Sequence, residues 1–224
     1  MTRTRLTGAA GIVFGIGFFL LGMFGLNTPD NGGKGAAARF AAFWQSSHHQ
    51  TQAMWTAFAV SYLIVLLLLF FAGLRALLRA VDAGPLPGLV AVLGPAAAVL
   101  LLGGIMLLVA FGVTADQSSG FTPDGNTALV FDEVSYAFAA VGLMAAGAAA
   151  VCTALVTLRT RVLPVWTAWV GFLVGIPALG SFLSAWVDFL LFPLWAVVVG
   201  VALLMTRTEV AERAMAREPV GAPV

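Results

Sequence analysis

Long apolar runs separated by short polar turns dominate this sequence. A helix that crosses the hydrocarbon core of a membrane needs about 20 mostly apolar residues. Runs of that length or more predict membrane spans at residues 6–26, 51–74, 86–114, 129–158, 163–183 and 189–205. The third and fourth runs exceed the thickness of a bilayer, so those helices should tilt or project beyond it. The predicted fold is an all-α, polytopic bundle of six transmembrane helices, forming one domain over residues 1–205.

Two of the apolar runs allow more than one assignment. The first apolar run resembles a secretory signal, but it continues from Leu6 to Leu26, whereas the apolar part of a signal peptide is about 7–15 residues long. We therefore expect a retained helix. The last two runs are separated only by residues 184–188. Fusing them would give a helix about twice as long as a bilayer requires, so a tight hairpin is predicted there.

The composition supports a membrane location and excludes several partners. Hydrophobic residues make up 61% of the chain and charged residues only 9%, compared with about 25% charged residues in soluble domains. Lipid must therefore cover most of the surface. The net charge of +1 is not gathered into a basic face, so no nucleic-acid partner is predicted. Cys152 is the lone cysteine, which excludes a disulfide within one chain.

The basic residues predict the orientation. If the N-terminus is cytoplasmic, the outer segments hold only Lys34 and Arg39. This positive-inside bias predicts cytoplasmic N- and C-termini, with residues 206–224 as a partly disordered cytoplasmic tail. The skew toward arginine over lysine suggests a GC-rich bacterial genome, so the predicted location is a bacterial plasma (inner) membrane. The nine arginines assigned to the cytoplasmic side are Arg3, Arg5, Arg75, Arg79, Arg159, Arg161, Arg207, Arg213 and Arg217.

The longest segment between spans, residues 27–50, is predicted to lie on the outer side. Its turn-rich start at 28–35 is followed by a short amphipathic helix over 36–44 with Phe40, Phe43 and Trp44 on one face. Such a helix is expected at the membrane interface, packed as a lid on the bundle. The second outer loop, 115–128, is polar. Asp124, or Asn126 with Thr127, is expected to cap the fourth span.

Glycines spaced four residues apart mark close helix contacts. Gly11 and Gly15 have this spacing in the first span, and Gly171 and Gly175 have it in the fifth. The favoured interpretation is packing within one chain. The alternative is a homo-oligomer formed through the Gly11/Gly15 or Gly171/Gly175 face.

The span centres carry no ionisable side chains, which excludes several kinds of membrane chemistry. A haem bundle needs histidines on facing helices, but His48 and His49 are adjacent and belong to one helix end. A retinal protein needs a lysine within a span, and Lys34 lies in a loop. No cofactor is therefore predicted, and a proton-coupled carrier becomes a weaker hypothesis.

One group of residues could hold a metal ion on the outer side. Histidine nitrogens and carboxylate oxygens are ligands that Zn²⁺ accepts. Two considerations oppose a site: acidic residues favour helix N-termini for dipole reasons alone, and adjacent helical residues point about 100° apart. The candidate metal ligands are His48, His49, Asp132, Glu133 and Asp188.

Four sequence features resemble a family of uncharacterised six-span membrane proteins common in actinobacteria, whose shared domain has no assigned function. They are the glycine-flanked start at 8–11, the Thr-Pro-Asp turn at 28–30, the polar stretch 124–128 and the segment 159–171. The last is similar to the family pattern Leu-Pro-x-Trp-x-x-Trp-x-Gly, except that Val165 replaces the usual basic residue. The resemblance implies the fold and the membrane location, and it implies no activity.

Taken together, these patterns favour a non-enzymatic membrane protein that acts as an accessory, partner-binding or sensing component. In this interpretation the protein contacts the lipid bilayer, and another membrane protein is a candidate partner. Two alternatives remain open at this point. One is a small permease with a pocket between helices, and the other is an enzyme that uses the outer metal-ligating group.

Overall fold

The structure is a computed structural model that describes residues 3–25, 27–118 and 120–205, apart from the side chains of residues 182–186. In this part of the chain all regular secondary structure is helical. The predicted tail at 206–224 lies outside the described residues, together with Arg207, Arg213 and Arg217. The helices are α1 (Arg3–Phe24), α2 (Ala36–Gln45), α3 (Ser47–Val81), α4 (Leu86–Gln117), α5 (Gly125–Thr160), α6 (Val165–Ala178) and α7 (Ser181–Met205).

Several of these helices are long and apolar enough to cross a membrane. By length and composition α1, α3, α4, α5 and residues Val187–Met205 of α7 qualify within the described chain. The chain therefore has the character of a multi-pass membrane protein. Helix α6 is apolar but has 14 residues, about 21 Å of helix, which is shorter than the hydrocarbon core of about 30 Å. Of the six predicted spans, this one is too short to cross alone.

The break between the last two helices lies earlier than predicted. The sequence pattern indicated a turn at 184–188, but these residues are part of α7, and the turn is formed by Leu179 and Gly180. There the N–H of Gly180 donates to the carbonyl of Pro177 at 2.8 Å. The prediction was wrong because Asp188, which was assigned to the turn, is buried on α7 two helical turns after Ser181.

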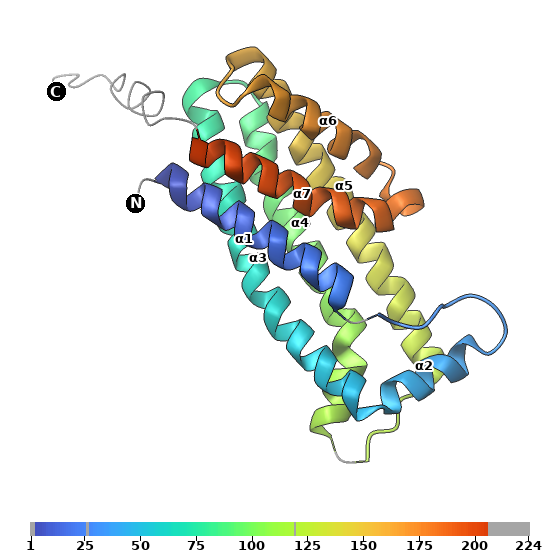
Figure 1. Ribbon diagram of the computed structural model, residues 1–224. Coiled ribbons are helices and arrows are strands. Elements are labelled where there is room, and N and C mark those ends of the chain that lie inside the picture. The colour runs from blue at the N-terminus through green and yellow to red at the C-terminus, as the bar shows by residue number, and fades with distance from the viewer. Residues whose placement is uncertain (1–2, 26, 119, 206–224) are drawn as a thin grey trace, which may run out of the picture.

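Figure 1 shows an elongated bundle whose helices differ in length. Helices α4 and α5, α1 and α7, and α3 and α4 form the most extensive pairs. One end of the bundle, called here the arginine end, carries the start of α1 and the turns 82–85 and 161–164 (Figure 1). The opposite end, called the α2 end, carries α2 and the loops on either side of it. Helices α1, α6 and α7 stop before the α2 end, whereas α3, α4 and α5 reach it (Figure 1).

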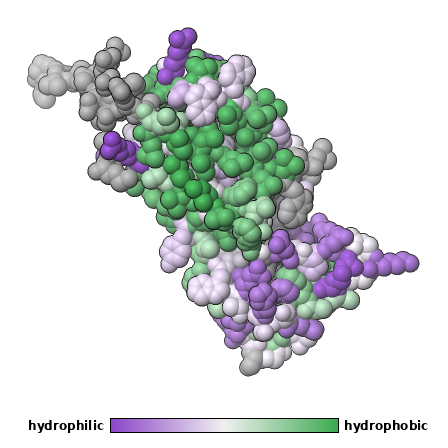
Figure 2. All heavy atoms as spheres, in the orientation of Figure 1, coloured by the Kyte–Doolittle hydropathy of each residue, from purple (hydrophilic) through white to green (hydrophobic). Residues whose placement is uncertain are grey.

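The helices that reach the α2 end are longer than a membrane requires. Helices α3 and α5 have 35 and 36 residues, which correspond to about 52–54 Å against about 30 Å of hydrocarbon. Figure 2 shows a broad hydrophobic surface over the rest of the bundle and a hydrophilic surface around α2. The predicted excess length of the helices at 86–114 and 129–158 is confirmed. The sequence pattern missed the same property in α3, because its polar start at 47–50 and its end at 75–81 were both assigned to loops.

Aromatic side chains fill the interior between α1, α3 and α7. Phe70 and Trp195 pack edge to face with ring centroids 5.8 Å apart, and Phe192 stacks on Trp195 at the same distance. Phe71 is also fully buried against them. Edge-to-face and offset contacts of this kind are the favoured arrangements of aromatic pairs. This part of the bundle is therefore a packed core.

The glycine pairs serve packing within one chain, as favoured from their spacing. A Cβ atom placed on Gly15 would meet the Pro193 carbonyl oxygen of α7, and one on Gly175 would lie 2.7 Å from the Gly147 carbonyl oxygen of α5. Gly11 and Gly171 are buried as well. Both faces are occupied by helices of the same chain, and the homo-oligomer considered above stays a prediction.

Candidate functional site

The α2 end has a small hydrophobic cluster of its own, which the partly buried Ile105 and Met106 of α4 join to the main core of the bundle. We call this unit the α2 cap: the loop 27–35, α2, and the ends of α3, α4 and α5 that contact them. Phe40 and Trp44 are buried on the face of α2 that turns toward the bundle. They pack with Ala53 of α3, Val109 of α4 and Ala128 of α5. The amphipathic helix and its role as a lid are thus confirmed, with α2 ending at Gln45.

Two glycines let α2 lie directly on the neighbouring helices. A Cβ atom on Gly125, at the start of α5, would overlap the Ala37 carbonyl oxygen of α2. A Cβ atom on Gly112 of α4 would be 2.5 Å from Ala53 Cβ and 2.6 Å from Trp44 Cζ3. A real Cβ does not approach other atoms this closely, so side chains larger than hydrogen would separate the elements of the cap.

Arg39 holds the loop that precedes α2. Its guanidinium donates to the backbone carbonyl of Lys34 at 3.1 Å, and to the carbonyls of Asp30 at 2.8 Å and Gly32 at 2.6 Å. Charged donors make stronger hydrogen bonds than neutral ones. One side chain therefore fixes three carbonyl groups of a loop that has no regular structure. The sequence pattern gave Arg39 no such role.

The corner between α2 and α3 uses one of the two histidines. Nδ1 of His49 lies 3.0 Å from the Phe43 carbonyl oxygen, and the imidazole stacks on the Phe43 ring with centroids 3.8 Å apart. Gln50 Nε2 donates to the Trp44 carbonyl at 2.9 Å. These contacts close the turn at Ser46. His49 is therefore part of the corner, while His48 is exposed.

Asp124 caps α5, as predicted. Its carboxylate accepts the backbone N–H of Thr127 at 2.9 Å and the Thr127 hydroxyl at 2.5 Å. The hydroxyl and the backbone N–H of Thr127 stabilise the charged form and lower the pKa of Asp124 below its ordinary value. The hydrogen bonds by which Asp124 caps the N-terminus of α5 are consequently retained down to a lower pH than an ordinary aspartate would allow. They are lost as the pH falls through the lowered pKa of Asp124.

The next two carboxylates of α5 meet the loop before α2. Glu133 accepts a hydrogen bond from Asn31 Nδ2 at 2.9 Å. Asp132 is half-buried beside Thr28 and Asn31. Asn31 thus joins the loop to α5, whereas Arg39 joins it to α2. The surface of the cap is acidic overall, with five carboxylates (Asp30, Asp116, Asp124, Asp132, Glu133) against two cations (Lys34, Arg39).

Asp188 lies apart from these groups. It is fully buried on α7, and its Oδ2 is 3.0 Å from the Ser181 hydroxyl. The same hydroxyl is hydrogen-bonded to the Ala178 carbonyl. Ser181 and Asp188 therefore fix the start of α7 against the end of α6. A carboxyl buried in this way needs hydrogen bonds, so a structural role explains its presence.

The structure does not gather the five predicted metal ligands. Within the described residues no three histidine, cysteine, aspartate or glutamate side chains come close enough together to hold a metal ion. His49 is engaged with Phe43, Glu133 with Asn31 and Asp188 with Ser181. Hydropathy places residues on one side of a membrane without specifying which helix neighbours which, so the metal site stays a prediction.

Two open grooves lie on the outside of the described part of the bundle. One of about 370 Å³ runs along the end of α3 beside Arg75 and Arg79. The other, of about 470 Å³, lies between the end of α1 and α3 and is lined by Leu21, Gln52 and Trp55 among others. Gln52 Nε2 donates to the Gly25 carbonyl at the rim of this second groove, 3.0 Å away. Neither groove enters the packed core.

No family model matches the chain, and no curated protein or solved structure is similar enough to count as a match. The resemblance to six-span actinobacterial proteins therefore stays a prediction. The function has to be inferred from the residues of this chain.

Proposed function

We propose that this chain is a non-enzymatic protein of a bacterial plasma membrane, with cytoplasmic termini, and that its α2 cap binds a partner protein on the outer side. The observation that carries the proposal is the hydrophobic cluster of the cap, built from Phe40, Trp44 and their neighbours at the ends of three helices longer than a bilayer. A bundle that needed only to cross the membrane would not require these extensions. The extra length places a folded, polar-surfaced unit outside the hydrocarbon.

The distribution of charge supports the orientation and suggests the character of the partner. The described arginines assigned to the cytoplasm, among them Arg3, Arg79 and Arg159, belong to segments that meet at the arginine end (Figure 1). Positive residues favour the cytoplasmic side. The α2 cap then faces outward with its excess of carboxylates, and a partner with a basic surface complements it.

The two alternatives have less support. A permease needs a polar pocket between helices, but Phe71, Leu101 and Leu143 are fully buried in a continuous apolar core, and both grooves lie outside it. An enzyme with a metal on the outer side needs its ligands together, and the described residues do not bring them together. Partner binding requires neither feature.

Site-specific photo-crosslinking in cells tests the proposal. A benzoyl-phenylalanine placed at Ala38, which is exposed on α2, is expected to give a discrete adduct with one protein. The same probe at Leu173, which is 69% exposed on the apolar surface of α6, is the matched control and should give no such adduct. Equal crosslinking from both positions, or none from Ala38, contradicts partner binding by the cap.

Cysteine labelling tests the orientation separately. In a Cys152→Ala background, Asn126→Cys at the α2 end should react with a membrane-impermeant maleimide in intact cells. Ala83→Cys, in the turn at the arginine end, should react only after permeabilisation, because that turn is expected in the cytoplasm. Both positions are exposed. The reverse pattern of labelling would invert the orientation and move the cap to the cytoplasmic side.

A further inference from the structure

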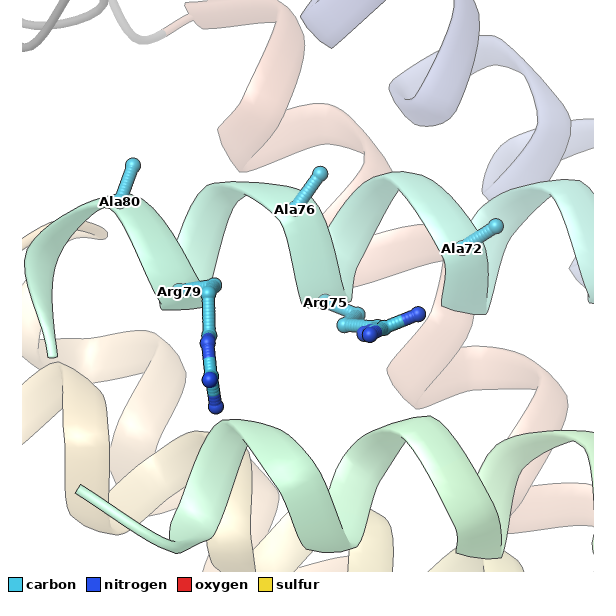
Figure 3. A pocket seen from close by; sticks show the side chains of 5 residues that line it. All are labelled: Ala72, Arg75, Ala76, Arg79 and Ala80. Atoms are coloured by element: carbon cyan, nitrogen blue, oxygen red, sulfur yellow. The ribbon is translucent and has the colours of Figure 1, made fainter. Parts of the chain in front are cut away.

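The groove at the arginine end lies on an exposed face of α3 with two chemically different edges. Ala72, Ala76 and Ala80 project from one edge, and Arg75 and Arg79 extend from the other toward α4 (Figure 3). The alanines leave the face shallow, so a ligand can lie against the helix. The two arginines are one turn apart, which is the spacing at which side chains on a helix are neighbours.

These arginines are available for an anion. Both are exposed, and the closest carboxylate along the chain, Asp82, does not neutralise them. Asp82 Oδ1 accepts the N–H of Gly84 at 2.7 Å, and its Oδ2 is buried without a hydrogen-bond partner. Guanidinium groups bind phosphate oxygens through paired N–H donors. Within the described residues, the two positive charges of the groove are therefore available to a phosphate group.

The same face of α3 continues as an apolar stripe. Val65, Leu68 and Leu69 are exposed on it, one and two turns before Ala72. The stretch of α3 from Val65 to Arg75 corresponds to about 15 Å of helix. This is half of the hydrocarbon thickness of about 30 Å. An apolar stripe one leaflet long that ends in two cations complements a phospholipid, whose acyl chain is apolar and whose phosphate is anionic.

From this juxtaposition we infer that the α3 groove binds an anionic phospholipid of the leaflet at the arginine end. The phosphate group accepts hydrogen bonds from Arg75 and Arg79, and an acyl chain lies along Ala72, Leu69 and Val65. A free phosphate ion shares the chemistry of the headgroup, but it would make no use of the stripe. The site is independent of the α2 cap and of any partner bound there.

Lipid binding to the purified full-length protein, followed by native mass spectrometry, tests the inference. We expect phosphatidylglycerol to bind at least about tenfold more tightly than phosphatidylcholine with the same acyl chains, because each surface cation attracts an anionic lipid. The double variant R75Q/R79Q should reduce binding of phosphatidylglycerol to the level of phosphatidylcholine. The control R159Q/R161Q removes two other exposed arginines of the same end and should leave the preference unchanged.

Two further arms separate the possible outcomes. Ala76→Leu fills the groove while both arginines remain, and it is expected to weaken phosphatidylglycerol binding as well. Inorganic phosphate at equal concentration should not displace the lipid. Equal losses in the two double variants would indicate diffuse surface charge, and full displacement by phosphate would indicate a free anion. Either result overturns the inference, as does unchanged binding in R75Q/R79Q with the thermal midpoint preserved.

Discussion

Replacing Trp44 with alanine is expected to release α2 from the bundle. Trp44 is 1% exposed and packs against Phe43, Ala53 and Gly112 at the centre of the cap core. Removing a buried aromatic side chain of this size costs about 3–5 kcal/mol, since both the transfer free energy and the cavity contribute. Amide hydrogen exchange should show the free energy of opening of α2 falling by that amount, up to complete loss of protection.

The matched control for this variant is Trp55→Ala. Trp55 is the same residue type close by on α3, but it is 67% exposed, so its truncation leaves no cavity. Exchange in α2 should remain as in the unmodified protein, and the main core should be unaffected by either variant. If Trp44→Ala leaves α2 fully protected, the cap does not depend on its own core. The proposal that the α2 cap is held in place by its own hydrophobic cluster would then be wrong.

Adding one methyl group at Gly15 is expected to separate α1 from α7. The Cβ atom would overlap the Pro193 carbonyl oxygen and lie 2.6 Å from Val197 Cγ2. Backbone atoms cannot rotate away as a flexible side chain would, so the helices themselves must move. Overpacking of this kind costs about 1–3 kcal/mol. We expect Gly15→Ala to lower the free energy of unfolding in mixed micelles by this amount.

Gly22→Ala, on the same helix, is the control. A Cβ atom on Gly22 would lie 3.8 Å from Phe189 Cδ1, which is an ordinary contact. Because alanine favours a helix over glycine by up to about 1 kcal/mol, this variant should be neutral or slightly more stable. If both variants change stability equally and in the same direction, the α1–α7 contact is not limited by backbone approach.

The two proposed binding sites occupy opposite ends of the molecule and have opposite charge. The α2 cap is acidic, and hydrogen bonds donated by Arg39 and Asn31 hold its loop in place. The α3 groove is basic. Within the described part of the chain, its two arginines are not paired with Asp82. The cations at one end and the acidic unit at the other are the features from which we propose the orientation of the bundle in a membrane. Each site can be removed by substitution without touching the other.

Some features of the site could be predicted from the sequence, and others could not. The role of Asp124 as the N-terminal cap of α5 could be predicted, and so could the helix that carries Phe40 and Trp44. Both depend on local rules that involve a few neighbouring residues. The role of Arg39 depends on the path of an irregular loop, which no periodic pattern describes. The pairing of Asn31 with Glu133 joins residues 102 positions apart. Contacts of this kind arise only when the helices have taken their places.

The bundle of apolar helices could be predicted from the residues alone, because lipid exposure needs long uncharged runs whatever their arrangement. The short helix before α3 could be predicted in the same way, and so could the packing of the glycine faces within one chain. The end of α6 could not be predicted, because the burial of Ser181 and Asp188 on α7 depends on neighbouring helices. The tertiary structure also decided that the predicted metal ligands stay apart, and that α3, α4 and α5 continue past α1 and α7 to carry the α2 cap. Hydropathy along the chain reports how each segment meets its surroundings, whereas these outcomes depend on which segments meet one another.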